Sequence, residues 1–374
     1  MWQAEIRVDL GAIRHNVARL RSVTTAEVMV VVKADGYGHG MVPVARAALE
    51  AGATWLGGCT VDEALALRAA GIEAPVLAWL TAPGVPLDRA VRAGVDLSVG
   101  SLESLAETIA AGRLAEQSAR VHLKIDTGLN RGGAKPAEWV ALVEAAAKAQ
   151  ADGHLDVVGV WSHLACADVV GHSSIDAQLA EYHDALEVAA RAGLRPRYRH
   201  LANSAATLTR PDTHFDLVRT GIAVYGLSPV RGEGFGLRPA MTVRGRVAVA
   251  KRVPAGEGVS YGHTYTTTGP TTLAVVPLGY GDGVPRHASN SGPVLLGGRR
   301  RTVAGRVCMD QIVLDCGDDP VRAGDVATLF GPGDQGEPTA DDWADAVGTI
   351  NYEIVTRIGG VRVPRRYDGE VRNE

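Results

Sequence analysis

Cysteine is scarce in this chain of 374 residues, and the four cysteines that occur are far apart. They are Cys59, Cys166, Cys308 and Cys316, so the chain has no C-x-x-C pair and no spacing typical of a disulfide framework. Proteins without disulfides are typical of reducing compartments. We therefore expect this protein to work in the cytoplasm.

The sequence also lacks a long apolar run, an excess of positive charge and the common metal motifs. No stretch approaches the roughly 20 apolar residues of a transmembrane helix, and the N-terminal MWQAEIRVDL carries charges where a secretory signal is apolar. The formal net charge of -4 gives no electrostatic reason to bind nucleic acid or an anionic membrane. No H-E-x-x-H, clustered Cys and His set or G-K-[ST] loop occurs. We expect a soluble protein without a metal, a nucleic acid or a membrane as partner.

Between residues 26 and 230, short apolar runs alternate with amphipathic stretches rich in alanine and leucine. The predicted strands are Val28–Val32, Trp55–Cys59, Pro75–Trp79, Asp96–Val99, Val121–Ile125, Val157–Ser162, Tyr198–Leu201 and Asp216–Val218. Helical patterns lie between most of them; one begins with a capping box of Thr60 and Glu63. This alternation favours parallel strands joined by crossover helices. An eight-stranded (β/α) barrel is the simplest architecture, and an open doubly wound sheet is the alternative.

The pattern changes after Gly236. The segments AMTVRGRVAVAKRV, TTLAVVPLGY, GPVLLGG and RTVAGRVCMDQIVLDCG are rich in valine and threonine and are separated by glycine, proline and Asp-Gly turns. Such a pattern is typical of antiparallel strands. We therefore expect an α/β domain at residues 10–231, followed by a mostly β domain at residues 232–374.

The segment VMVVVKADGYGHG (28–40) ends an apolar run on a lysine and then enters a glycine-rich turn. Lys33 is the only charged residue between Glu27 and Asp35. One interpretation is a lysine at a strand end whose ammonium reaches water. The other is an amine held against apolar groups, where it acts as a nucleophile or base. In a barrel, Lys33 would end the first strand at the face where active sites of this fold form, and Tyr37 would project from the next loop.

Two later segments would end at the same face of a barrel. HLANSAA leaves a strand at Asn203 and Ser204, and VRTGIAVYG leaves one at Arg219 before Gly221 and Ile222. Loops after the last two strands of a barrel often bind phosphate through backbone amides. A lysine opposite such a phosphate site suggests a phosphorylated aldehyde held as a Schiff base, which predicts pyridoxal phosphate as the cofactor.

Seven motifs give the chain a family resemblance. In order they are VVKADGYGHG, KIDTGLNRGG, HLANSAA, VRTGIAVYG, VSYGHTY, GYGDG and RVCMDQ. Together they resemble the alanine racemases, fold type III enzymes that depend on pyridoxal phosphate, over residues 6–367. The resemblance implies a homodimer of a barrel and a β domain, with residues 1–9 joining the β domain and each active site completed by the partner subunit. It also implies two-base interconversion of L- and D-alanine and a supply of D-alanine for peptidoglycan.

The resemblance assigns roles to individual residues. Lys33 would carry the cofactor, and Tyr261 from the other subunit would be the second base. The residues implied around the phosphate are Tyr37, Ser204, Gly221, Ile222 and Tyr352; those around the cofactor ring are His163, Asn203 and Arg219; and those around the substrate are Arg131, Tyr280, Cys308, Met309 and Asp310. Lys124 matches a lysine that is carbamylated in many members of the family.

Two other functions fit parts of the sequence. A fold type III decarboxylase would share the barrel and Lys33, but it has no reason to keep VSYGHTY beside RVCMDQ. A non-enzymatic pyridoxal-phosphate carrier would lack the second domain. Alanine as the substrate comes from the resemblance alone, because one carbon of pocket difference discriminates by only about 1–3 kcal/mol. The sequence does not separate a biosynthetic from a catabolic role.

Overall fold

The computed structural model describes residues 2–369. The chain forms two compact units. The barrel unit contains residues 14–36 and 41–237, and the β unit contains the described residues up to 13, 37–40 and from 238 onward. Over the described part of the chain, no helix has both the length and the apolar character needed to cross a membrane.

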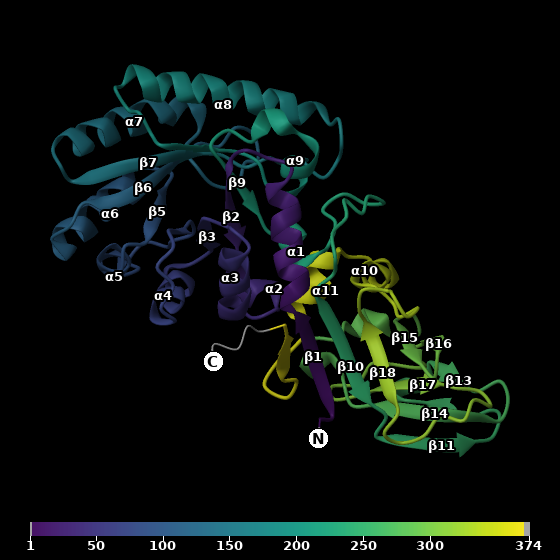
Figure 1. Cartoon of the computed structure of the whole chain (residues 1–374). Helices are drawn as coiled ribbons and strands as arrows, with labels where there is room; N and C mark the ends of the chain where they lie inside the picture. The colour runs from purple at the N-terminus through teal and green to yellow at the C-terminus, as the bar shows by residue number, and fades with distance from the viewer. Residues whose placement is uncertain (1, 370–374) are drawn as a thin grey trace. The chain divides into compact units, whose positions relative to one another are not determined.

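The barrel unit is built on a sheet of eight parallel strands (Figure 1). They are β2 (Glu27–Val31), β3 (Trp55–Gly58), β4 (Val76–Ala78), β5 (Asp96–Val99), β6 (Ala119–Lys124), β7 (Leu155–Trp161), β8 (Tyr198–His200) and β9 (Leu217–Thr220). Each strand from β2 to β8 pairs with the next, and β9 pairs with β2. Between β8 and β9, the Arg219 amide donates to the Ala202 carbonyl at 3.0 Å. The sheet is thus a nearly closed barrel, as predicted, and the doubly wound alternative is wrong.

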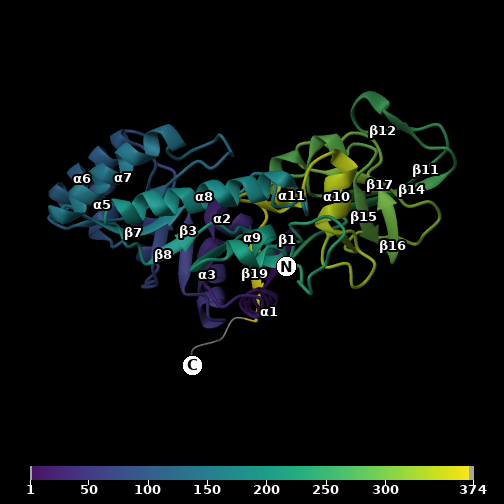
Figure 2. The ribbon, with the colours of Figure 1, turned by 90° about the horizontal axis from the view of Figure 1, so that it is seen from above.

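Helices connect these strands on the outside of the barrel. They are α3 (Met41–Glu50), α4 (Val61–Ala69), α5 (Leu87–Arg92), α6 (Leu102–Ala115), α7 (Pro136–Ala151), α8 (Ser173–Arg191) and α9 (Ser204–Thr209), and α1 (Leu10–Arg21) precedes β2. The predicted capping box begins α4, where the Glu63 amide donates to Thr60 Oγ1 at 3.2 Å. Helices α7 and α8 run side by side outside β6 and β7 (Figures 1 and 2).

Alternate residues of a strand point to the same face, so every second residue of each barrel strand points inward. One buried apolar cluster draws on six of the strands: Met29, Trp55, Leu77, Val158, Tyr198 and Leu217. Because all eight strands are parallel, their carboxyl ends meet at one end of the barrel. Lys33, which follows β2, belongs to this end together with Lys124, Trp161 and His200, the last residues of β6, β7 and β8.

Within residues 2–369, the β unit contains three sheets. The largest has the order β16 (Arg299–Thr302), β15 (Pro293–Leu296), β18 (Val326–Phe330), β10 (Met241–Arg246), β1 (Ala4–Asp9) and β19 (Arg365–Asp368). The second sheet joins β11 (Val249–Val253), β14 (Thr271–Val276) and β17 (Ile312–Asp315). The third joins β12 (Gly258–Val259) and β13 (Tyr265–Thr266). Helices α10 (Ala340–Val347) and α11 (Asn351–Arg357) complete the unit. The pairing of β1 with β19 is parallel, unlike the antiparallel arrangement expected.

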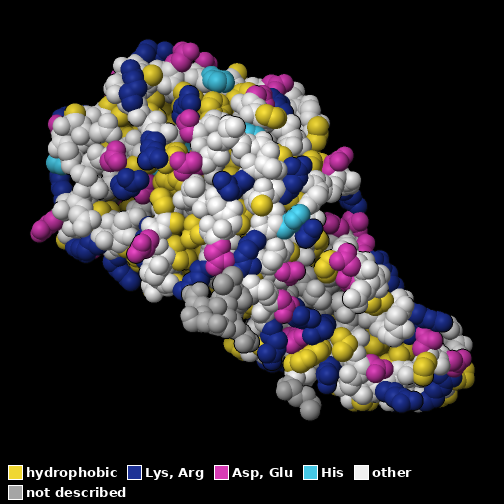
Figure 3. Space-filling view, in the orientation of Figure 1, with side chains coloured by type: hydrophobic (Ala, Val, Ile, Leu, Met, Phe, Trp, Pro, Cys, Tyr) yellow, Lys and Arg dark blue, Asp and Glu magenta, His cyan; other side chains and the backbone are white. Residues whose placement is uncertain are grey.

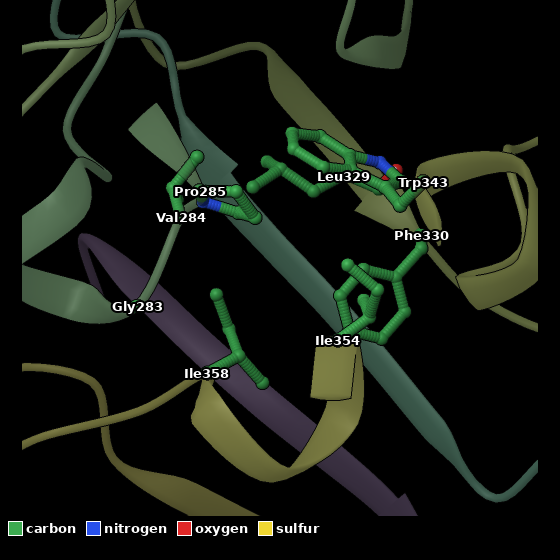
Figure 4. Close-up of a pocket in the computed structure, with 8 residues that line it drawn as sticks. All are labelled: Gly283, Val284, Pro285, Leu329, Phe330, Trp343, Ile354 and Ile358. Carbon is green, nitrogen blue, oxygen red and sulfur yellow. The ribbon is translucent and has the colours of Figure 1, made fainter. Parts of the chain in front are cut away.

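The β unit also holds a small apolar pocket (Figure 4). Its lining residues are Gly283, Val284, Pro285, Leu329, Phe330, Trp343, Ile354 and Ile358. The Trp343 indole N–H donates to the Leu329 carbonyl at 2.6 Å, so the one polar side-chain group in the lining is already hydrogen-bonded. A pocket without a charged or nucleophilic side chain offers no group for catalysis.

Charged side chains of both signs are interspersed over the face in Figure 3. The three consecutive arginines of β16 follow this pattern, because each is paired with a carboxylate. Arg299 and Arg301 pair with Asp319, and Arg300 pairs with Asp342. This segment therefore presents no uncompensated basic patch.

Candidate functional site

Lys33 begins a left-handed turn, labelled α2 (Lys33–Tyr37) in Figure 1. The φ angles are 52° at Ala34 and Asp35, 62° at Gly36 and 51° at Tyr37. Left-handed helical backbone costs residues with a side chain about 1–2 kcal/mol each. Several such residues in a row are retained only where surrounding groups hold them, and such strain is concentrated at functional sites.

Hydrogen bonds to neighbouring described residues hold this turn. They run from the Gly36 amide to the Val32 carbonyl at 2.8 Å, from the Ala34 amide to Glu63 Oε1 at 2.7 Å, and from the Met41 amide to Asp35 Oδ1 at 2.9 Å. The second oxygen of Glu63 accepts from the Cys59 amide at 2.6 Å. Glu63 therefore ties the segment after β2 to the segment after β3 and fixes the backbone next to Lys33.

The Lys33 side chain is half-buried against an aromatic wall. Its Nζ lies 5.8 Å from the centroid of the Trp79 ring. Burial raises the pKa of the neighbouring Cys59 thiol, and the charge of Lys33 partly opposes this. Lys33 is therefore partly withdrawn from water beside Trp79.

Arg219 on β9 is the most buried cation at this end of the barrel, with 5 % of its surface exposed. Its Nη1 atom donates to the His200 carbonyl at 2.9 Å and lies 3.2 Å from His200 Nδ1. Its Nη2 atom donates to the Ser162 carbonyl at 2.8 Å and the Leu201 carbonyl at 3.2 Å, and lies 3.2 Å from His163 Nδ1. Among the described residues, no acceptor pairs with the Nε–H group. That donor is therefore available to a ligand.

The charge of Arg219 has no carboxylate partner within residues 2–369. The guanidinium carbon lies 4.7 Å from the centroid of the Trp161 ring, and burial lowers the pKa of Arg219 to about 10. Burial also lowers the pKa of His163 well below its usual range, with further lowering by the charges of Arg219, Arg131, Lys124 and Lys33. A neutral His163 can accept from Arg219, and a donor without a counter-charge suits a neutral ligand acceptor such as a pyridine nitrogen.

The loops after β8 and β9 are joined by one side chain. Ser204 Oγ accepts from the Gly221 amide at 2.8 Å and from the Ala223 amide at 3.4 Å. Asn203 is the N-cap of α9, with its Oδ1 accepting from the Ala206 amide at 3.0 Å. Ser204, Gly221 and Ile222 are thus neighbours, and their hydroxyl and amide groups are the kinds of donor that bind phosphate.

Lys124 and Arg131 belong to the segment that leaves β6. Lys124 Nζ lies 4.5 Å from the Trp161 ring centroid. Burial, with the charges of Arg219 and Arg131, lowers its pKa to about 8. Arg131 is exposed in a loop whose base is held by Asp126, which accepts from the Gly128 and Asn130 amides at 3.0 Å.

Five of the predicted residues cluster in the β unit. Tyr261 opens the short turn η3 (Tyr261–His263), and the preceding Ser260 donates to the Arg306 carbonyl at 2.7 Å and lies 3.2 Å from Cys308 Sγ. The Tyr280 amide donates to the Cys308 carbonyl at 2.9 Å. Asp310 and Met309 follow directly, and Asp310 pairs with Arg362. Tyr261 is 70 % exposed and Met309 53 % exposed.

The remaining two predicted residues, Tyr37 and Tyr352, pack together in the β unit. Their ring centroids lie 6.4 Å apart at an interplanar angle of 49°. The barrel unit thus holds Lys33, Lys124, Arg131, His163, Asn203, Ser204, Arg219, Gly221 and Ile222, and the β unit holds Tyr37, Tyr261, Tyr280, Cys308, Met309, Asp310 and Tyr352.

Sequence reasoning missed four residues that shape the barrel end. Trp79 and Trp161 flank the lysines, Glu63 anchors the turn, and His200 contacts Arg219. Trp79 is the last residue of one predicted strand and Trp161 the second-last residue of another, so their positions near strand ends could have identified them. Glu63 was identified only as part of a capping box, since its contact with Ala34 joins distant parts of the chain.

Comparisons with known proteins agree over almost the whole chain. Residues 8–229 match the family model of the alanine racemase N-terminal domain, and residues 240–367 match that of the C-terminal domain. The chain is 71 % identical to the alanine racemase of Salinispora tropica, covering 99 % of this chain and 100 % of that protein. The alanine racemase structure from Streptomyces lavendulae is 54 % identical with a TM-score of 0.98, covering 99 % of this chain and 98 % of that one. The alanine racemase structure from Bacillus anthracis with bound L-Ala-P is 37 % identical with a TM-score of 0.90, covering 100 % of this chain and 96 % of that one. The chain belongs to the alanine racemase family.

Proposed function

We propose that this protein interconverts L- and D-alanine with pyridoxal phosphate as its cofactor. The observation that carries the proposal is the pairing, at one barrel end, of Lys33 on a strained turn with a buried Arg219 that keeps one N–H group for a ligand. Bound L-Ala-P in the Bacillus anthracis relative supports an alanine-like ligand. We further propose that the protein supplies D-alanine for peptidoglycan in the cytoplasm.

The donors in the barrel fit this cofactor. Bound pyridoxal phosphate supplies an electron sink that eases removal of the α-proton of an amino acid. Lys33 would attach the aldehyde, and Arg219 Nε–H would donate to the ring nitrogen beside His163 and Asn203. Ser204, Gly221 and Ile222 would donate to the phosphate, and we assign Tyr37 and Tyr352 to the same group.

Arg219 would also influence whether the α-proton returns to Cα of the substrate. A guanidinium does not readily give up a proton, so Arg219 would leave a ring nitrogen bound to it unprotonated. The electron sink that the cofactor supplies would then be weaker than with a carboxylate partner in place of Arg219. Prompt return of the proton to Cα is favoured over transfer of the amino group.

Racemisation needs a proton removed from one face of the substrate and returned to the other. We assign Lys33 to one face and Tyr261 of a second copy of the chain to the other. The high exposure of Tyr261 and Met309 supports a second copy covering them, and hence a homodimer. An unperturbed phenol has a pKa of about 10, so nearby cations would have to favour the phenolate.

The substrate carboxylate requires donors of its own. We assign Arg131 and the Met309 amide to it, with Tyr280, Cys308 and Asp310 beside them. Lys124 fits a carbamylation site, because a pKa of about 8 makes the neutral amine accessible near neutral pH. The carbamate would place a negative charge beside Arg131 and Arg219, whose charges now lower that pKa.

The test is incubation of the purified protein and pyridoxal phosphate with L-alanine in deuterated water. We expect loss of optical activity with deuterium entering at Cα. Release of carbon dioxide would instead support a decarboxylase, and an unchanged amino acid would support a non-enzymatic carrier. Tyr261→Phe should slow exchange from one enantiomer more than from the other, and equal, near-normal exchange would count against the two-base assignment.

A further inference from the structure

A line of buried polar side chains runs through the barrel to Arg219. Asp96 Oδ2 lies 3.2 Å from His122 Nε2, His122 Nδ1 lies 2.8 Å from His200 Nε2, and His200 Nδ1 lies 3.2 Å from Arg219 Nη1. Asp96 is 1 % exposed and both histidines are fully buried. Asp96 is the first residue of β5 and His200 the last of β8, so the line runs from the amino ends of the strands toward their carboxyl ends.

The barrel is built to hold these rings. The Trp161 and His200 rings stack with centroids 5.7 Å apart at 2°, and the Trp55 ring meets the His122 ring edge-on at 5.4 Å. Position 159 must be glycine, because a Cβ atom there would lie 2.3 Å from His122 Nδ1. Neither ring can turn without displacing packed neighbours.

The Asp96 carboxylate and the Arg219 guanidinium determine which nitrogen of each histidine between them carries a proton. An ionised carboxylate only accepts hydrogen bonds, and a guanidinium only donates them. Three contacts separate Asp96 from Arg219, and each needs one proton. Arg219 supplies the proton in its contact with His200 Nδ1, so the proton of His200 lies on Nε2 and points to His122 Nδ1. The proton of His122 then lies on Nε2 and points to Asp96. Burial and the neighbouring His122 and Arg219 lower the pKa of His200 well below its usual range, in keeping with a neutral ring.

We propose that Asp96 and His122 are positioning residues for the reaction, because they fix the His200 tautomer that turns the Nδ1 lone pair toward Arg219. This lone pair holds Nη1 at 3.2 Å and would leave Nε–H available to the ring nitrogen of the bound cofactor. The tautomers follow from the structure alone, and only their effect on the cofactor rests on the proposed function.

We call the line of hydrogen bonds from Asp96 through His122 and His200 to Arg219 the relay. Asp96→Asn tests it because an amide can donate as well as accept. The Asn amide can donate to His122 Nε2, which turns both histidines to the Nδ1–H form and sets the His200 N–H against an N–H of Arg219. Arg120→Gln is the matched control. Arg120 donates to the same carboxylate at 2.8 and 3.2 Å, so its loss removes an ion pair and leaves the contact between Asp96 and His122.

The direct readout is nitrogen NMR of the full chain labelled with 15N-histidine, with pyridoxal phosphate bound and after its removal. We expect protonated Nε2 and unprotonated Nδ1 at His122 and His200 in the wild type and in Arg120→Gln, and altered signals for both rings in Asp96→Asn. Protonated Nδ1 of His200 in the wild type, or unchanged His200 signals in Asp96→Asn, would overturn the relay.

A second readout is cofactor retention and the visible absorption spectrum of the bound cofactor. We expect Asp96→Asn and His122→Phe to shift the spectrum and raise the cofactor dissociation constant about tenfold, by analogy with the loss of residues that orient metal ligands, with little change in Arg120→Gln. Equal retention and spectra in all forms would overturn the relay. Because the tautomers are read without turnover, a wild-type protein that fails to racemise alanine would overturn the proposed function and not the relay.

Discussion

Glu63 on α4 accepts a hydrogen bond from the Ala34 amide at 2.7 Å, so a carboxylate 30 residues beyond Lys33 holds the backbone next to that lysine. The other oxygen of Glu63 accepts from Cys59 at 2.6 Å. The left-handed turn depends on this carboxylate, because its backbone conformation is unfavourable in isolation.

Glu63→Ala is therefore expected to destabilise the turn. The free energy of unfolding should fall by about 1.5–3 kcal/mol, the usual contribution of a hydrogen bond to a charged group, and the protein should lose pyridoxal phosphate faster on dialysis. Denaturant titration and cofactor absorbance measure the two effects. Asp62→Ala, at an exposed position of the same helix, is the control; equal losses in the two variants would refute a specific role of Glu63.

Arg219→Glu is expected to change the outcome of the reaction as well as its rate. A carboxylate facing the ring nitrogen would favour its protonation and strengthen the electron sink. Racemisation should slow about 10²-fold, as when a preorganised electrostatic group is removed, and pyruvate should appear as the amino group passes to the cofactor. Arg219→Lys keeps a cation and should form no extra pyruvate. Unchanged racemisation and pyruvate in Arg219→Glu would contradict this role.

Buried neutral histidines should make the protein sensitive to acid. The pKa values of His163 and His200 are lowered in the folded state, so below about pH 6.5 the unfolded chain binds more protons than the folded one. Stability is then present above that pH and is lost as pH falls toward the folded pKa values. His163→Gln should flatten the dependence of Tm on pH between 7 and about 5, whereas His287→Gln at an exposed position should leave it unchanged. Parallel curves for His163→Gln and the wild type would contradict this prediction.

Lys124 is expected to react with carbon dioxide. The neutral amine would attack carbon dioxide and release a proton, forming a carbamate. With a pKa of about 8, the neutral fraction rises steeply around that pH. Carbon NMR with 13C-bicarbonate should show a carbamate signal that grows with pH over this range and is absent in Lys124→Gln. Lys148→Gln, at a surface lysine whose pKa is raised by Asp152, is the control. A signal that persists in Lys124→Gln would place the modification elsewhere.

Much of the fold follows from local sequence patterns. The alternation of apolar runs and helical stretches predicted the barrel, because strand and helix periods are read from neighbouring residues. The parallel pairing of β1 with β19 was not predicted, since it joins the first and last described strands of the chain.

The candidate site was predictable only in part. Lys33 drew attention as an isolated charge at a strand end, and family motifs supplied most of the other residues. The strained turn, the line from Asp96 to His200 and the aromatic walls of Trp79 and Trp161 depend on contacts between strands far apart in sequence. No local pattern encodes such contacts, so only the folded structure reveals them.

The most direct measurement is mass spectrometry of the protein after it is loaded with pyridoxal phosphate, reduced with borohydride and digested. We expect a single phosphopyridoxyl adduct, on the peptide that contains Lys33, and no adduct in Lys33→Ala. An adduct on Lys124 or on a surface lysine, with Lys33 unmodified, would contradict it.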